Sequence, residues 1–310
     1  MQALSCKPKR RAMRTQRMTS SFFLRRRLAF AAAAASLLAA CSPIKLVDRL
    51  TPRDTYFGET GIAYGAEPRQ QLDLYRPLPE TMPAEGRRPL IVFFYGGTWT
   101  TGERASFKFV GEALASRGAV VVLPDYGRSP AFRYPGFVQD SALAVKWALD
   151  NAARLGADPK QVYVMGHSSG GYNAAMVALD ARWLGAVGGS PKQLAGWIGL
   201  AGPYDFLPIE NPDAQVAFNW PDTPADSQPL MHASAAAPRT LLIAATKDKL
   251  VNPVRNTGQM AARLRAAGVP VETREFDDLS HITLIGAVAK PLHWLGGPVL
   301  PPVQAFLGLP

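Results

Sequence analysis

Short apolar runs alternate along the chain with segments whose apolar residues have helical spacing. Six runs of six residues are β-like: LIVFFY (90–95), AVVVLP (119–124), QVYVMG (161–166), GWIGLA (196–201), TLLIAA (240–245) and VETREF (271–276). The first five are nearly continuously apolar, which is typical of strands that are buried on both faces of a parallel sheet. The pattern therefore predicts a sheet whose central strands are covered on both sides.

Two segments between these runs predict helices. Apolar residues are spaced by three and four at Val138, Ala142, Val145 and Leu149, and again at Met260, Leu264 and Ala267. Residues at this spacing share one face of a helix. Gly268 and Pro270 end the second pattern, because neither residue continues a helix well. Alternating strands and helices of this length predict an α/β fold, with an open, mostly parallel sheet and helices on both faces.

The chain divides into three parts by composition. Residues 1–40 form a leader, 41–70 a tether and an N-terminal edge, and 71–310 a single α/β domain. One long irregular stretch, about 203–238, is rich in Pro, Asp and Ala and lies between two predicted strands, where a short lid insertion would fit. The only cysteines are Cys6 and Cys41, so we expect no disulfide in the domain.

The net charge of +10 is concentrated in the leader. Nine of the 34 basic residues and none of the 24 acidic residues lie within 1–40. The rest of the chain is therefore close to neutral. A basic surface that binds nucleic acid is not indicated, and we expect no nucleic-acid partner.

The leader has the pattern of an export signal. FFLRRR ends a positively charged region, LAFAAAAASLL forms an apolar core that is too short to span a bilayer, and LAAC ends at Cys41. This ending resembles the lipobox of bacterial lipoprotein signal peptides. The resemblance implies export, lipidation of Cys41 and a membrane anchor, with Ser42 favouring the periplasmic face of the outer membrane. An ordinary secretory signal with a chance cysteine is the alternative, and translation starts at Met1 or Met18.

The stretch 166–170, Gly-His-Ser-Ser-Gly, lies between a predicted strand and a predicted helix. It fits the pattern G-x-S-x-G, in which a serine sits on a sharp, strained turn and its neighbours two residues away must be small. Ser168 has glycine two residues before and after it, whereas Ser169 would need glycine at position 167. Ser168 is therefore the candidate nucleophile; a tight turn without chemistry is the alternative.

A serine nucleophile needs a base, and the chain has four histidines: His167, His232, His281 and His293. His281 follows the strand-like run VETREF and a short loop, which places it at the carboxyl end of a strand. His167 lies inside the turn and points elsewhere, and His232 lies in the lid-like stretch. His293, beside Trp294, is the remaining alternative as a base. We take His281 as the base.

The base needs a carboxylate to orient it and to stabilise its charged form. Asp248 follows the run TLLIAA and so also lies at a carboxyl end. Asp277 and Asp278 are rivals, but they lie only three or four residues before His281 and are better suited to turning the loop. Asp248 is therefore the candidate acid.

The tetrahedral intermediate of acyl transfer needs hydrogen-bond donors for its oxyanion. The backbone N–H of Ser169, directly after the nucleophile, is one candidate. A second group follows the run LIVFFY, where Tyr95-Gly96-Gly97-Thr98-Trp99 allows close approach of the backbone to a substrate. Trp99, Phe218 and Trp220 are candidates for the wall of the substrate pocket, with packing inside the lid as the alternative.

Residues 88–290 resemble the α/β-hydrolase esterases of the hormone-sensitive-lipase and kynurenine-formamidase-like type. Five elements carry the resemblance, in order: YGGTW, LPDYGRSP, GHSSGG, GLAGPYDF and TKDKLV…LSH. The resemblance implies an α/β-hydrolase fold and a carboxylesterase that uses the triad Ser168, Asp248 and His281 and needs no metal or other cofactor. It also implies that Gly97, Thr98 and Ser169 supply the oxyanion donors.

The chain departs from this family pattern at one position. Family members usually carry His where this chain has Tyr95, and that residue props the loop through a side-chain hydrogen bond, which a Tyr hydroxyl can also make. Two other functions remain open from the sequence: an arylformamidase-like hydrolase of activated amides, and a non-catalytic lipoprotein that uses the hydrolase fold for binding.

Overall fold

A computed structural model describes residues 47–81, 88–289 and 299–310. All of the described residues lie in one compact unit, 44–310. The predicted export signal and Cys41 lie outside the described residues. In the part that is described, no helix has the length and apolar character needed to cross a bilayer.

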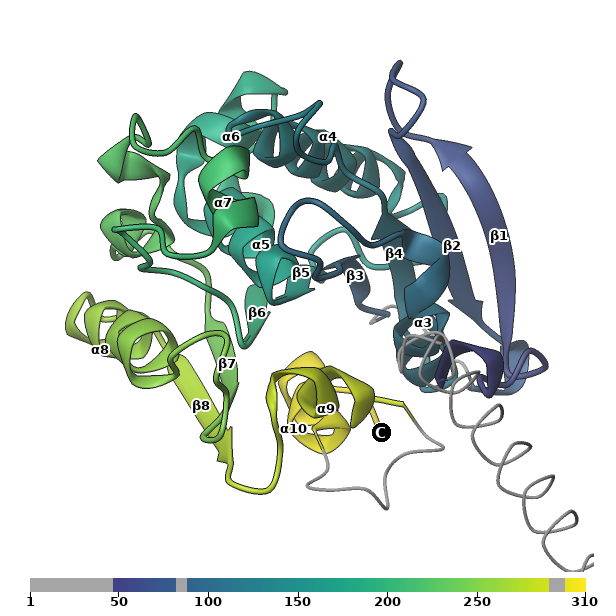
Figure 1. Ribbon diagram of the computed structural model, residues 1–310. Coiled ribbons are helices and arrows are strands. Elements are labelled where there is room, and N and C mark those ends of the chain that lie inside the picture. The colour runs from purple at the N-terminus through teal and green to yellow at the C-terminus, as the bar shows by residue number, and fades with distance from the viewer. Residues whose placement is uncertain (1–46, 82–87, 290–298) are drawn as a thin grey trace, which may run out of the picture. The chain divides into compact units, whose positions relative to one another are not determined.

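Eight strands form one sheet at the centre of the unit 44–310 (Figure 1). They are β1 (Tyr56–Ala63), β2 (Gln71–Pro77), β3 (Leu90–Phe94), β4 (Val120–Pro124), β5 (Val162–His167), β6 (Gly196–Leu200), β7 (Thr240–Ala245) and β8 (Val271–Phe276). Their order across the sheet is β1-β2-β4-β3-β5-β6-β7-β8. The pairs β1–β2 and β2–β4 are antiparallel and all the others are parallel, so the mostly parallel sheet predicted from the sequence is confirmed.

Each of the six β-like runs forms a strand whose ends lie within one residue of the expected ones. Every residue of β3, β4, β5, β6 and β7 is buried. In β8, which is an edge strand, most residues are exposed or half-buried. Continuous apolarity therefore marked the central strands, as expected for strands covered on both faces.

The strands β1 and β2 form an antiparallel hairpin at the other edge. Their pairing runs from Tyr56 opposite Pro77 to Ala63 opposite Gln71. The predicted segment boundary between residues 70 and 71 therefore falls inside this hairpin. The N-terminal edge belongs to the same sheet as the rest of the domain.

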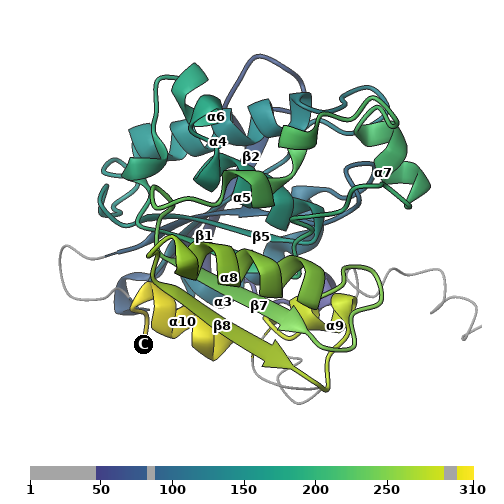
Figure 2. The same ribbon diagram turned by 90° about the vertical axis from the view of Figure 1, so that its left-hand side faces the viewer.

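Helices cover both faces of the sheet (Figures 1 and 2). One face carries α4 (Gly136–Asn151), α5 (Ser169–Leu179) and α6 (Ala181–Ala186), and the other carries α3 (Lys108–Ala115) and α10 (Leu300–Leu307). The helix α8 (Gln259–Ala266) lies between β7 and β8 in sequence. Both helices predicted from apolar spacing are present, as α4 and α8.

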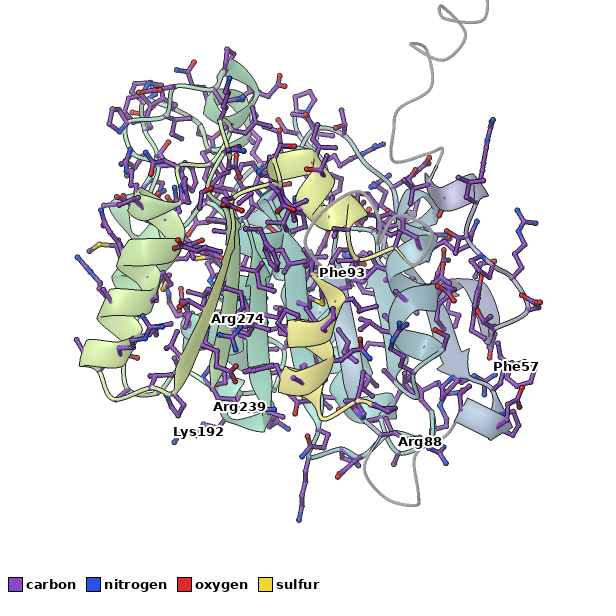
Figure 3. All side chains as sticks on the ribbon, turned by 90° about the horizontal axis from the view of Figure 1, so that it is seen from below. Phe57, Arg88, Phe93, Lys192, Arg239 and Arg274 are labelled. Atoms are coloured by element: carbon purple, nitrogen blue, oxygen red, sulfur yellow. The ribbon has the colours of Figure 1, made fainter. Side chains whose placement is uncertain are left out.

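The two ends of the parallel strands differ in their side chains. Figure 3 shows Arg88, Lys192 and Arg239, which precede β3, β6 and β7, at the amino ends of the parallel strands. Arg239 packs over the ring of Phe306, 4.1 Å from its centroid, and so ties α10 to these strand ends. The carboxyl ends of the same strands lie on the opposite side, and ligands bind there in open α/β sheets.

Candidate active site

Ser168 lies on the turn between β5 and α5, with φ 55° and ψ −126°. A positive φ is uncommon for a residue other than glycine and is found at strained functional sites. A Cβ atom on Gly166 would lie 2.1 Å from the carbonyl oxygen of Gly170, and one on Gly170 would lie 2.1 Å from that of Phe94. The turn therefore needs both glycines, for the steric reason predicted from the sequence.

His281 is the first residue of α9 (His281–Gly286), which follows β8 after a short loop. The helix begins with a capping box, in which the side chains of Ser280 and Thr283 each accept from the other residue's backbone N–H. This cap fixes where the helix starts. His281 Nε2 lies 2.8 Å from Ser168 Oγ, and the imidazole is buried.

Asp248 lies just after β7, and its Oδ2 is 2.6 Å from Nδ1 of His281. Its other oxygen accepts from the N–H groups of Leu250 and Val251, at 2.8 and 2.9 Å. Burial alone would raise the pKa of this carboxyl group, but the bonds and charge from His281 and the two N–H groups outweigh it and lower the pKa. Asp248 is therefore held as a carboxylate against the imidazole.

The rival residues lie elsewhere. Asp277 and Asp278 are exposed in the loop before His281, as expected for residues that turn it. His232 lies 2.7 Å from the carbonyl oxygen of Asp226, within the lid-like stretch. His293 lies outside the described residues. No group of three or more His, Cys, Asp or Glu in the described ranges is placed to hold a metal ion.

The loop after β3 has an unusual backbone. Gly97, Thr98 and Trp99 have positive φ values of 145°, 52° and 57°. A Cβ atom on Gly97 would lie 2.3 Å from the carbonyl oxygen of Thr101, so only glycine fits there. Such strain clusters at functional sites, where the surrounding structure maintains it.

Three backbone N–H groups near Ser168 are available as donors. Across the described ranges, those of Gly97 and Thr98 donate to no protein acceptor. That of Ser169, in the first turn of α5, has no intrahelical acceptor. Thr98 and Ser169 line the same cavity as Ser168, whereas Gly97 is not part of that lining. These groups could stabilise an oxyanion that forms beside Ser168.

Tyr95, at the start of the loop after β3, supports that loop through a network of polar side chains. Its hydroxyl donates to Asp125 Oδ1 at 2.6 Å and accepts from Arg69 Nη2 at 2.9 Å. Arg104 donates to both oxygens of Asp125 as well, through its backbone N–H and its guanidinium group. The Tyr95 ring stacks on Tyr126, with 4.8 Å between centroids. The tyrosine thus makes a side-chain hydrogen bond of the kind expected at the family's histidine position.

A cavity of about 310 Å³ opens beside Ser168 and His281. The lid-like stretch and the segment after β7 build its wall, with Phe206, Pro208, Ile209, Leu250 and Arg255 among the lining residues. The lid-like stretch contains α7 (Pro212–Ala217). The lining of the cavity mixes apolar and polar groups, which suits a small organic substrate.

The three aromatic residues expected at the pocket differ in their positions. Trp99 lines the cavity and donates from Nε1 to Asn173 Oδ1 at 3.1 Å. Phe218 is fully buried and packs edge-on against Trp99, with 4.8 Å between ring centroids, so it supports the wall from behind. Trp220 is 37% exposed and does not contribute to the lining. Of these three residues, Trp99 alone lines the cavity.

His167 is the site residue that the sequence did not reveal. Its Nε2 lies 3.0 Å from the backbone carbonyl oxygen of His281, and the two rings are 4.8 Å apart. Burial, and after it the charge of the nearby His281, lower the pKa of His167 to about 3, although the bond to the His281 backbone and the charge of Asp248 act in the opposite direction. Its position next to the nucleophile was the only signal in the sequence.

Comparisons with known proteins point to the same fold. A family model described as alpha/beta hydrolase fold matches residues 91–285. Probable isoprenylcysteine alpha-carbonyl methylesterase ICMEL1 of Arabidopsis thaliana is 32% identical over 151 residues, which cover 47% of this chain and 31% of that protein. Esterase LipC of Mycobacterium tuberculosis is 28% identical over 229 residues, or 68% of this chain and 56% of that protein.

The matches thus span about a third of the methylesterase and just over half of LipC. Among solved structures, the esterase Est2 of Thermogutta terrifontis superimposes with a TM-score of 0.59 and 25% identity, over 75% of this chain and 85% of that one. These relatives share the fold, and their names all denote esterases.

Proposed function

Since the chain belongs to the α/β-hydrolase family, we propose that it is a serine carboxylesterase that cleaves carboxylic esters through an acyl-enzyme. One observation carries the proposal: Asp248, His281 and Ser168 form a continuous hydrogen-bonded chain, with distances of 2.6 and 2.8 Å, beside an open cavity. The names of the relatives support the same reaction class.

Acylation begins when Ser168 Oγ attacks the ester carbonyl carbon. His281 Nε2 accepts the hydroxyl proton as the new C–O bond forms. Asp248 accepts from Nδ1–H of the same ring, so it selects the tautomer whose Nε2 is free to take the proton. The carboxylate also stabilises the imidazolium that results.

The carbonyl oxygen becomes an oxyanion in the tetrahedral intermediate. The N–H groups of Ser169 and of the Gly97-Thr98 loop are the proposed donors. The intermediate collapses when the bond to the alkoxide leaving group breaks and His281 gives it the proton. Water then attacks the acyl carbonyl carbon while His281 takes its proton. When the bond between this carbon and Ser168 Oγ breaks, His281 returns the proton to Oγ and the acid is released.

The direct test compares two neighbouring serines. Ser168→Ala should lower kcat for p-nitrophenyl acetate by at least about 10⁴-fold, because the nucleophile is lost. Ser169→Ala is the matched control: it removes a hydroxyl from the same turn but keeps the backbone N–H, so activity should stay within about tenfold of wild type. Equal activity of Ser168→Ala and wild type would refute the assignment.

We also propose that the protein is exported and anchored in the bacterial envelope through a lipid on Cys41. The lipobox-like sequence Leu38–Cys41 supports this. In a bacterial host given radiolabelled palmitate, the wild-type protein should carry label and partition into detergent. Cys41→Ala should do neither, and an unlabelled wild-type protein would contradict the anchor.

A further inference from the structure

His167 makes a direct contact with the backbone of the proposed base. It is the last residue of β5 and is 4% exposed. Its Nε2 lies 3.0 Å from the carbonyl oxygen of His281. His167 therefore joins the two residues that react, because it precedes Ser168 in the chain and contacts His281 in space.

The chemistry of this contact fixes the state of the ring. A carbonyl oxygen only accepts, so Nε2 of His167 must carry the proton and donate it. Nδ1 is then an unprotonated acceptor, and it has no hydrogen-bond partner within the described part of the chain. The ring stays neutral at ordinary pH, because its burial lowers its pKa to about 3. A neutral ring at 4.8 Å does not repel the imidazolium that His281 becomes.

Hydrogen bonds hold His281 and the start of its helix at several points. The helix that it begins has six residues, and the loop before it is largely exposed. Asp248 holds the imidazole ring, and the capping box of Ser280 and Thr283 holds the start of the helix. The bond from His167 is the one that ties the backbone of His281 to the nucleophile turn itself. The backbone of Ser168 is held separately, because its N–H donates to the carbonyl of Leu200 at 3.0 Å.

We propose that His167 is a positioning residue for the reaction: its Nε2–H holds the carbonyl of His281 and so keeps the base at hydrogen-bonding distance from Ser168. This inference rests on the proposed function. A displacement of about 1 Å between reacting groups can lower a rate by about 10²-fold. Loss of the donor should therefore slow chemistry rather than substrate binding.

A purely space-filling role for His167 makes a different prediction. If the ring only filled the core, an apolar residue of similar volume would serve equally well. If it were a second base, it would need to contact Ser168 Oγ, but Nε2 is committed to the carbonyl of His281 and Nδ1 bonds to no group in the described part of the chain. The donor at Nε2 is thus the property that distinguishes these roles.

Two variants separate them. His167→Leu removes the donor and keeps an apolar side chain, and we expect kcat for p-nitrophenyl acetate to fall by about 10- to 100-fold with KM within about twofold of wild type. His167→Gln keeps a side-chain N–H near the position of Nε2, and kcat should recover to within about threefold of wild type. Thermal unfolding of both variants shows whether they are folded at the assay temperature.

The labelling rate with a fluorophosphonate gives a second readout that does not depend on the substrate. The Leu variant should react more slowly than the Gln variant by the same ratio as their kcat values. Equal rates for the two variants, or a folded Leu variant as fast as wild type, would overturn the positioning role. Wild-type protein that labels but cleaves no ester would refute the esterase proposal alone, and the labelling ratio would still test His167. Wild-type protein that neither labels nor cleaves would overturn both.

Discussion

At the scale of single residues, the site requires glycine at two positions, because a Cβ atom there would clash with the backbone. The side chain of Ser168 is presented by a turn with positive φ, and Gly166 and Gly170 make room for that turn against neighbouring carbonyl groups. The reactive serine is therefore specified as much by its two neighbours as by its own hydroxyl.

Gly170→Ala tests this requirement. The new Cβ would lie 2.1 Å from the backbone oxygen of Phe94 and 2.4 Å from that of Tyr95, and this end of β3 cannot move without disturbing the sheet. We expect a loss of at least about 3 kcal/mol in the free energy of unfolding, at the upper end for overpacking, and loss of activity. Gly185→Ala, where a Cβ meets nothing within 4 Å, is the control. Similar denaturation midpoints for the two variants would contradict the steric argument.

Asp248→Asn tests the role of the carboxylate. An amide at this position can hold the His281 ring in the wrong tautomer, with Nε2 protonated and unable to accept from Ser168. By analogy with other triads, kcat should fall by about 10⁴-fold while the fold is kept. Asp277→Asn, in the exposed loop before His281, should leave kcat within about twofold of wild type. A larger loss of kcat in Asp277→Asn than in Asp248→Asn would show that Asp277 is the carboxylate that orients His281.

At the scale of elements, the triad and the oxyanion donors come from the loops that follow β3, β5, β7 and β8, and the stretch after β6 adds to the wall of the cavity. Parallel strands bring their carboxyl ends to one edge, so residues that are far apart in sequence meet there. The loop after β3 has the most strained backbone, and it rests on Tyr95 and the network around Asp125. The shape of this loop should therefore depend on the tyrosine hydroxyl.

Tyr95→Phe removes that hydroxyl and leaves Asp125 and Arg69 each without one partner. Buried polar groups that lose a partner typically destabilise a protein by about 1–3 kcal/mol. We expect a loss in that range by urea denaturation, together with a severalfold lower kcat from a less well fixed oxyanion loop. Tyr163→Phe also removes a tyrosine hydroxyl, one that donates to Gln161 and accepts from Arg239, and should leave kcat unchanged. An unaltered kcat in Tyr95→Phe would show that the loop does not need this support.

The sequence predicted the strands because each is a local pattern, and it predicted the positions of Ser168, Asp248 and His281 because each follows such a strand. The Tyr95 network was not predictable in detail, since Arg69 and Asp125 lie 26 and 30 residues from Tyr95. The lid-like stretch has no period from which to infer which aromatic side chains face the cavity, so the sequence left open whether Phe218 and Trp220 line it or pack inside the lid. The contact of His167 with His281 spans 114 residues and depends on the fold as a whole.

At the scale of the whole molecule, stability should depend on pH through His167. The folded protein holds this ring neutral, with a pKa of about 3, whereas the unfolded chain takes up a proton near 6.5. The unfolded state therefore binds more protons between these values, and stability falls as pH decreases from about 6.5. Asp248 and Asp180, whose pKa values are lowered, lose their contribution only below about 4.

Thermal unfolding at pH 7.5 and 4.5 measures this dependence. Between the two pH values, the free energy of unfolding of the wild-type protein should fall by about 2–3 kcal/mol more than that of His167→Gln. The reason is that the variant cannot bind the extra proton when it unfolds. Comparing the pH-dependent change within each protein removes any difference in their stability at pH 7.5. Equal changes in the two proteins would show that His167 is not held neutral by burial.

The proposed reaction requires Ser168 to act as an activated nucleophile, and covalent labelling with a fluorophosphonate followed by peptide mass spectrometry tests this most directly. The predicted result is one phosphonyl adduct on Ser168 in the wild-type protein, retained in Ser169→Ala and absent from Ser168→Ala. An adduct that persists in Ser168→Ala, or a folded wild-type protein that takes up no label, would contradict the catalytic assignment.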